Sequence, residues 1–158
     1  MDGLSAAASG FAVVSLAVQL VGSVRQIRQF LRSISEAPEE LRRLMDLLEE
    51  LELILEQVGI LVQSQRRNSI LWETGVLTSV LKAANSCQIK LAMLEGVVEA
   101  TKKAFAASNR TTRALGSFKL ACKKKDLREI ESQLHNAANL LSLSMMANLT
   151  YVEDSYFT

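Results

Sequence analysis

The sequence predicts an all-α protein: a bundle of about four long helices and one short helical segment, with a hydrophobic helix at the N-terminus. Only one proline occurs in 158 residues, and aromatic residues make up 5% of the chain. Leu, Ala, Glu, Lys and Ser dominate instead, and this composition favours helices over strands. Apolar residues also recur at steps of three and four, as the buried stripe of a helix does. Because 49% of the residues are hydrophobic, we expect one domain, residues 1–158, with a sizeable core.

The first helix is expected over residues 1–34, and its opening stretch carries no charge. Residues 3–24 lie between Asp2 and Arg25 without an acidic or basic side chain. This length suits a bilayer, since about 20 apolar residues cross a hydrocarbon core of roughly 30 Å. A secretory signal peptide is disfavoured, because Asp2 stands where such a signal has a basic start. Two interpretations remain: a helix buried at the centre of a bundle, or a segment that enters a membrane once it is released.

Helical spacing divides the surface of this first helix into unequal parts. A weak polar stripe covers about a third of its circumference. This stripe consists of Ser5, Ser9, Ser15, Gln19 and Ser23. Small residues spaced seven apart form a narrow line along which another helix can approach closely, and they are Gly3, Gly10 and Ala17. The remaining surface is apolar, so the helix suits both a core and lipid.

A second and a third helix are expected at residues 38–66 and 70–106. Glu39 and Glu40 lie near the start of the second helix, where they meet the positive end of its dipole. The apolar seam of this helix consists of Leu41, Leu44, Leu48, Leu51, Leu55, Val58 and Val62. The polar segment 63–69 is expected to connect it to the third helix, which should run antiparallel to the second.

The last part of the chain is expected to hold a short and a long helix. A loop or broken turn over residues 106–117 precedes a short helical piece at 118–122. The long helix is expected over residues 125–152, and its stripe consists of Leu127, Ile130, Leu134, Ala137 and Leu141. From Thr150 onward the chain is less committed to helix.

The net charge of +1 conceals two segments of opposite charge. Residues 36–56 hold eight acidic and two basic side chains, a balance of −6. Residues 80–125 hold ten basic and two acidic side chains, a balance of +8. The basic segment could attract an anionic membrane, near which a Lys or Arg contributes about 1 kcal/mol. Alternatively, both segments are ordinary solvated faces of helices that complement each other.

The sequence lacks the parts of the common catalytic sites. It has no glycine-rich phosphate loop followed by Lys and Ser or Thr, and its one histidine, His135, cannot supply a di-iron site. Cys87 and Cys122 show no metal-ligand spacing and are expected to be reduced thiols. A net charge near zero also disfavours nucleic-acid binding. We therefore expect no enzyme activity, no cofactor, no metal and no nucleic-acid partner.

Four blocks of the sequence resemble the fungal HeLo-like N-terminal domain, and together they cover nearly the whole chain. The blocks are MDGLSAAASGFAVVSLAVQLV, APEELRRLMDLLEELELILEQV, RRNSILWETGVLTSVLKAANSCQIKLAMLE and SFKLACKKKDLREIESQLHNAANLLSLSMMANL. Domains of this family occur at the front of fungal STAND proteins, the NOD-like receptors, and in their effector partners. The resemblance implies a cytoplasmic helical bundle that induces cell death. Such a domain oligomerises, moves to the plasma membrane and exposes its N-terminal hydrophobic segment.

The resemblance also implies roles for particular residues and partners. The segment that enters the membrane maps to residues 3–24, and its inserting side chains would be Leu4, Phe11, Val14, Leu16, Val18, Leu20 and Val21. The contacts to anionic lipid are expected from the basic segment 80–125, and they would come from Lys102, Lys103, Arg110, Arg113, Lys119, Lys123, Lys124 and Lys125. The implied partners are anionic membrane lipids, other copies of the chain, and a NOD-like receptor or an amyloid-signalling protein.

A non-lytic interaction module is the alternative function. Such a module would self-associate or dock onto a receptor through its leucine seams and polarised charge, and it would bind without causing leakage. The effector hypothesis predicts instead that membrane disruption depends on lipid and on the first helix. Removal of residues 1–24 is therefore expected to abolish leakage only if the chain is an effector.

Overall fold

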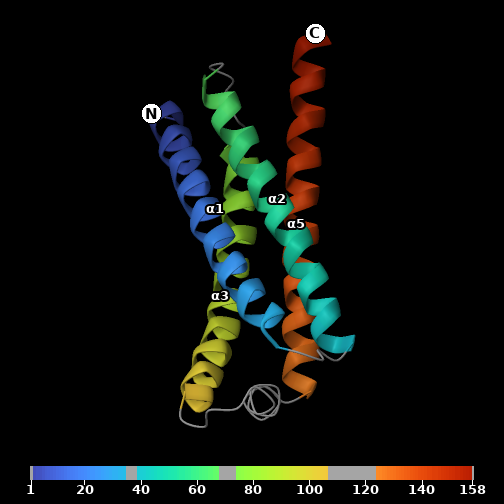
Figure 1. The fold of residues 1–158 in the computed structure, drawn as a ribbon. Coiled ribbons are helices and arrows are strands. Elements are labelled where there is room, and N and C mark those ends of the chain that lie inside the picture. The colour runs from blue at the N-terminus through green and yellow to red at the C-terminus, as the bar shows by residue number, and fades with distance from the viewer. Residues whose placement is uncertain (1, 35–38, 68–73, 107–123, 158) are drawn as a thin grey trace.

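The computed structural model of the chain describes residues 2–34, 39–67, 74–106 and 124–157. These residues form α1 (Asp2–Arg32), α2 (Glu39–Arg67), α3 (Thr74–Ala106) and α5 (Lys124–Phe157). The all-α prediction is confirmed, since the described residues contain helices and no strand (Figure 1). The short helical piece expected at 118–122 lies outside the described residues.

Two helices extend further than the sequence indicated. α2 continues into the polar segment and ends at Arg67, one residue past its expected end at 66, and α5 continues through residues 153–157, past its expected end at 152. Neither extension contains Gly or Pro, so nothing in the local sequence breaks the helix. At the other end of α2, Glu39 and Glu40 occupy the first turn.

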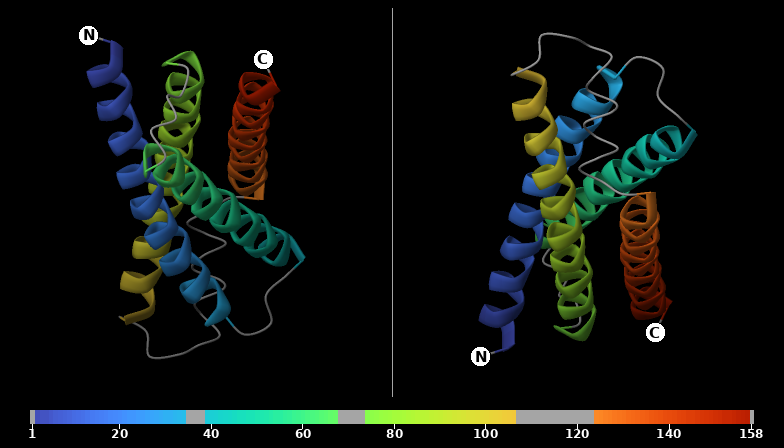
Figure 2. Two further views of the ribbon diagram at one scale, coloured as in Figure 1. Left: turned by 90° about the horizontal axis from the view of Figure 1, so that it is seen from above. Right: turned by 90° about the horizontal axis from the view of Figure 1, so that it is seen from below.

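The four helices pack in a ring in the order α1, α2, α5, α3. The successive helices α2 and α3 are therefore not main neighbours. α1 packs against α2 and α3, and α5 packs against the same two helices. α1 and α3 run in one direction along the bundle, whereas α2 and α5 run in the other (Figure 1). α2 and α3 are thus oppositely directed, as expected, but the main contacts of each are with α1 and α5. The views in Figure 2 show α1 and α3 crossing each other, with α5 apart from α1.

All four helices contribute to one hydrophobic core. Its largest fully buried side chains are Ile27, Leu31, Leu41, Leu44, Leu48, Leu51, Leu55, Leu77, Leu91, Leu94 and Leu134. The apolar seam expected on α2 is entirely buried. Full burial of such a side chain contributes about 1.5–3 kcal/mol, so this core is the main source of stability in the described bundle.

α1 is not the central helix that one interpretation of the sequence predicted. Val13, Leu20 and Val24 point into the core and are at most 2% exposed, but the opposite side of the helix faces solvent. In its most apolar stretch only 33% of the residues are buried. The reason is the ring packing, which gives α1 two neighbouring helices and leaves its outer side uncovered.

Candidate functional site: the outer face of α1 and its clamp to α2

The outer face of α1 carries no charged side chain between residues 8 and 24. Its exposed residues are Ala8, Phe11, Ala12, Ser15, Val18, Gln19 and Gly22. Phe11 is 62% exposed and Val18 is 68% exposed. By length and composition, residues 8–32 meet the requirements for a membrane span, with a mean hydropathy of 1.4. A core helix of a soluble protein can have the same length and composition. The exposure of this apolar face therefore distinguishes α1 from a core helix better than its composition does.

The side chains expected to insert into lipid lie on both sides of α1. Phe11 and Val18 are exposed, and Val14 is half-buried. Three others belong to the core, namely Leu16, Leu20 and Val21. Leu4 lies in α1 outside the residues whose side chains are described. In this conformation lipid could reach only the exposed side chains, such as Phe11 and Val18. Contact with the three core side chains would require α1 to leave the core.

An open groove of about 600 Å³ separates the uncharged part of α1 from α2. Its walls are mainly apolar and include Val14, Val18, Val21, Leu55 and Ile60. The two helices are in close contact at Ala17, since a Cβ on Gly59 would stand 3.9 Å from the Ala17 Cβ. Of the other residues expected on the small-residue line, Gly10 is buried and Gly3 lies outside the described side chains.

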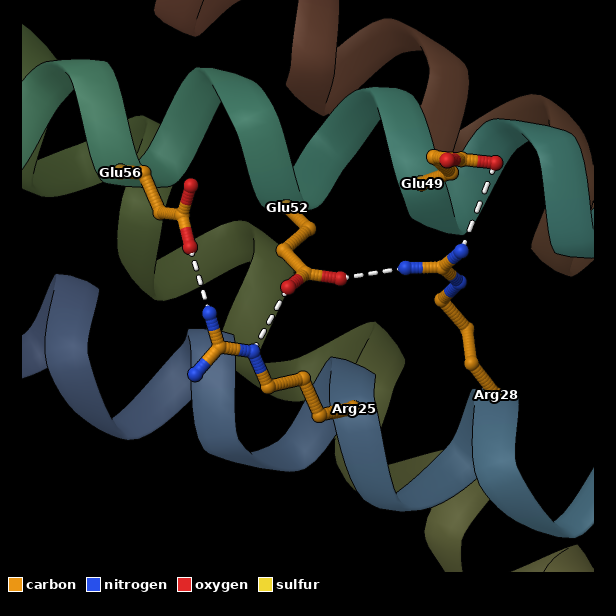
Figure 3. A network of polar contacts seen from close by, with 5 residues as sticks. All are labelled: Arg25, Arg28, Glu49, Glu52 and Glu56. Carbon is orange, nitrogen blue, oxygen red and sulfur yellow. Dashed lines mark hydrogen bonds and ion pairs between the residues drawn. The ribbon is translucent and has the colours of Figure 1, made fainter.

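Five charged side chains join the next part of α1 to α2, and we call them the clamp (Figure 3). Arg25 donates from Nε to Glu52 Oε1 over 2.6 Å, and from Nη2 to Glu56 Oε1 over 2.6 Å. Arg28 donates from Nη1 to Glu52 Oε2 over 2.5 Å, and its Nη2 lies 3.4 Å from Glu49 Oε2. Glu52 therefore accepts from both arginines, one on each carboxylate oxygen.

The centre of the clamp is largely shielded from water. The side chains of Arg28 and Glu52 are each 12% exposed, whereas that of Arg25 is 60% exposed. Burial alone would raise the pKa of Glu52, but hydrogen bonds and positive charge from Arg25 and Arg28 outweigh it and lower this pKa. The Glu52 hydrogen bond raises the pKa of Arg25 in turn. Arg28 Nε is buried and has no hydrogen-bond partner among the described residues. Its lost hydration reduces the net stabilisation that the Arg28–Glu52 pair provides.

The clamp follows from simple helical spacing. Arg25 and Arg28 are three residues apart, and Glu49, Glu52 and Glu56 are three and four apart, so each set lies on one side of its helix. In the sequence, the three acids stand out only as part of the acidic segment 36–56, and nothing near them in the chain indicates their partners on α1. The matching periodicity of the two sets was the available signal, but the alignment of α1 with α2 was required to join them.

Two of the basic residues expected to contact lipid have described side chains. Lys102 and Lys103 are exposed in the last turns of α3. Lys102 Nζ lies 3.2 Å from Glu99 Oε1 and 5.8 Å from the centre of the Phe30 ring. Lys124 and Lys125 lie in the first turn of α5, at the same end of the bundle as the end of α3 (Figure 1). Arg110, Arg113, Lys119 and Lys123 lie outside the described residues.

A smaller polar cleft of about 380 Å³ lies between α2 and α5. Arg43 Nε lies 3.6 Å from Glu131 Oε1 there, and His135 lines the same cleft. Within the described ranges, no group of three or more His, Cys, Asp or Glu side chains could hold a metal ion. Burial raises the pKa of the Cys87 thiol to about 12, so this thiol is protonated at neutral pH.

No family model, curated protein or solved structure matches this chain.

Proposed function

We propose that the chain is a membrane-permeabilising cell-death effector of the HeLo-like type. In this proposal the bundle is stored in the cytoplasm, oligomerises on activation, moves to the plasma membrane and inserts α1. The observation that supports it most strongly is the uncharged outer face of α1, on which Phe11 and Val18 are exposed. The inner face of the same helix is apolar because it belongs to the core.

A solvent-facing helix of a globular protein ordinarily has charged and polar residues opposite its buried stripe. Between positions 8 and 24, Ser15 and Gln19 are the only exposed polar residues of α1, and Ser9 and Ser23 are half-buried. Hydrocarbon could therefore surround this part of the helix at little cost in desolvation, since no ionised group has to leave water. A core role alone requires an apolar inner face and gives no reason for an uncharged outer one.

Anionic lipids and other copies of the chain are the proposed partners of the active form. Lys102 and Lys103 are exposed at one end of the bundle, where α5 begins with Lys124 and Lys125. Several such charges near an anionic surface contribute about 1 kcal/mol each to attraction. A NOD-like receptor or an amyloid-signalling protein is the proposed source of the activating signal.

A single substitution on the outer face tests the proposal. Val18→Asp places a charge about 7 Å from the middle of residues 3–24, at 1.5 Å per residue. It should lower dye release from phosphatidylserine-containing liposomes by about 30-fold, since a charge in that region costs about 2 kcal/mol. Because Val18 is 68% exposed, the soluble bundle should keep its fold. The measurement uses the chain fused to an oligomeriser, with circular dichroism as the folding check.

Ile89→Asp is the matched control, because Ile89 is 60% exposed and lies on α3. We expect its dye release to equal that of the unmodified chain. Removal of residues 1–24 is a poorer test, since Val13, Leu20 and Val24 belong to the core and the remainder would lose its fold. Equal leakage from the Val18→Asp and Ile89→Asp variants would contradict insertion of α1.

The exposed apolar side of α5 favours a second candidate, a non-lytic interaction module. Leu140, Leu143 and Met146 are between 53% and 63% exposed and lie three residues apart. The seam of α2, by contrast, is buried and could not dock a partner without unfolding. A folded, clustered chain that releases no dye from anionic or neutral liposomes would support this second function.

A further inference from the structure

We propose that Arg25 and Arg28 exchange partners during activation: the carboxylates of α2 hold them in the closed bundle, and phosphate groups of anionic lipids hold them after α1 is released. This inference rests on the proposed function and adds a lipid-binding site to it. In the closed state the clamp sets two guanidinium groups against three carboxylates, which leaves the site with a net charge of −1. The closed clamp therefore offers no net positive charge to an anionic surface.

Release of α1 from α2 leaves the arginines of the clamp without their carboxylates. Residues 25–32 carry Arg25, Arg28 and Arg32 and no acidic residue, so the freed end of α1 has a charge of +3. The three arginines are spaced three and four apart and thus lie on one side of the helix. Guanidinium groups bind phosphate oxygens through paired hydrogen bonds, in the geometry with which they bind carboxylates. Lipid phosphate is thus a chemically equivalent replacement for Glu49, Glu52 and Glu56.

The position of the arginines along α1 also fits the depth of lipid phosphates. Residues 3–24 span about 33 Å as a helix, close to the thickness of a hydrocarbon core of roughly 30 Å. Arg25 then lies where the hydrocarbon ends, and Arg28 and Arg32 follow one and two turns beyond it. Arg28 is only 12% exposed in the closed bundle, so lipid can reach it only when α1 and α2 part.

Two variants that break the same clamp from opposite sides distinguish this inference from a merely structural role. Glu52→Gln weakens the closed state but leaves the arginines intact. Arg25→Gln with Arg28→Gln weakens the closed state and also removes the lipid ligands. A structural clamp predicts that both variants change membrane binding in one direction, whereas partner exchange predicts opposite directions.

The measurement is cosedimentation of the 158-residue chain with phosphatidylserine–phosphatidylcholine vesicles and with phosphatidylcholine vesicles. Glu52→Gln should increase binding to the anionic vesicles by about 10-fold, since the closed state loses its charge-assisted hydrogen bonds. The double Arg→Gln variant should reduce it by about 30-fold, or about 5-fold for each arginine. Arg25→Lys with Arg28→Lys keeps both charges and should retain at least the original binding.

Arg42→Gln with Arg43→Gln is the matched control. It removes the same charge, and it breaks the Arg43–Glu131 pair between α2 and α5 instead of the clamp. Binding lost equally by this control and by the Arg25/Arg28 variant would overturn the inference, as would a change in one direction for both clamp variants. Arg25→Gln alone, at a side chain that is 60% exposed, gives a second test if the double variant does not fold.

Three further outcomes separate this inference from binding of soluble phosphate and from the proposed function. Competition by inorganic phosphate that depends on Arg25 and Arg28, with unchanged vesicle binding, would assign the site to soluble phosphate and overturn the lipid assignment. Opposite changes in vesicle binding without any dye release would support partner exchange and contradict permeabilisation. Dye release that persists in the double Arg→Gln variant at unchanged vesicle binding would overturn partner exchange and leave the effector function in place.

Discussion

The two parts of α1 are attached to the bundle by different forces. Residues 8–24 have no charge and are held by apolar packing, with Val13, Leu20 and Val24 in the core. Residues 25–32 add ion pairs to that packing, since Arg25 and Arg28 bind the carboxylates of α2. Hydrocarbon can replace the apolar contacts, whereas Arg25 and Arg28 keep charged partners only where other anions replace the carboxylates. A membrane with an anionic surface offers hydrocarbon to residues 8–24 and lipid phosphates to Arg25 and Arg28. These two environments follow each other in the same order as the two parts of α1.

Apolar packing of the uncharged part should give the largest effect on stability. Leu20 is 2% exposed, so Leu20→Ala leaves a cavity and should lower the free energy of unfolding by about 3 kcal/mol. Val18→Ala, on the outer face of the same helix, should change it by less than about 0.5 kcal/mol. Urea unfolding followed by circular dichroism measures both values. Similar losses from the two variants would mean that the outer side of α1 is covered in solution.

The clamp should give a smaller effect that depends on pH. At neutral pH, Glu52→Gln should lower the free energy of unfolding by about 2 kcal/mol, since charge-assisted hydrogen bonds from two arginines are weakened. The pKa of Glu52 lies below its ordinary value of 4.5 in the folded chain, so as the pH falls the unfolded chain takes up this proton first. The contribution of the carboxylate is therefore complete above about pH 4.5 and is lost as the pH falls through the folded pKa.

Urea titrations between neutral pH and about pH 3 would test this dependence. The difference between the unmodified chain and the Glu52→Gln variant should shrink in acid. The deficit of Leu20→Ala should stay constant, because no titrating group is involved. A Glu52→Gln deficit that is as large in acid as at neutral pH would show that packing, rather than charge, holds the basic end of α1.

The helices could be predicted from the sequence because their signal is local. The seam of α2 from Leu41 to Val62 repeats at three and four residues, and the same residues are buried. The weak polar stripe of α1 likewise contains Ser15 and Gln19, and both are exposed. Each of these patterns reports the side of a single helix, for which no knowledge of its neighbours is required.

The arrangement of the helices and the clamp depend on contacts that are distant in sequence. The pairs Arg28–Glu52 and Arg25–Glu56 join residues 24 and 31 positions apart, on two helices whose relative alignment no local pattern records. The place of α1 in the ring was missed for the same reason. Its uncharged surface was consistent with a central helix, and only the observed contacts with α2 and α3 leave one side open.

Gly22 lies at the boundary between the two parts of α1, and its substitution should give a smaller effect than Leu20→Ala or Glu52→Gln. A Cβ at Gly22 would meet no atom within 4 Å, and the same holds for Gly96 on α3. Gly22→Ala and Gly96→Ala should each raise the free energy of unfolding by about 0.5–1 kcal/mol, because Ala has the higher helix propensity. Equal gains in urea unfolding would mean that the groove beside Gly22 is open in solution, so that the packing and the clamp hold α1 independently. A loss for Gly22→Ala beside a gain for Gly96→Ala would mean that α2 closes over Gly22, and the two parts of α1 would then have to be released together.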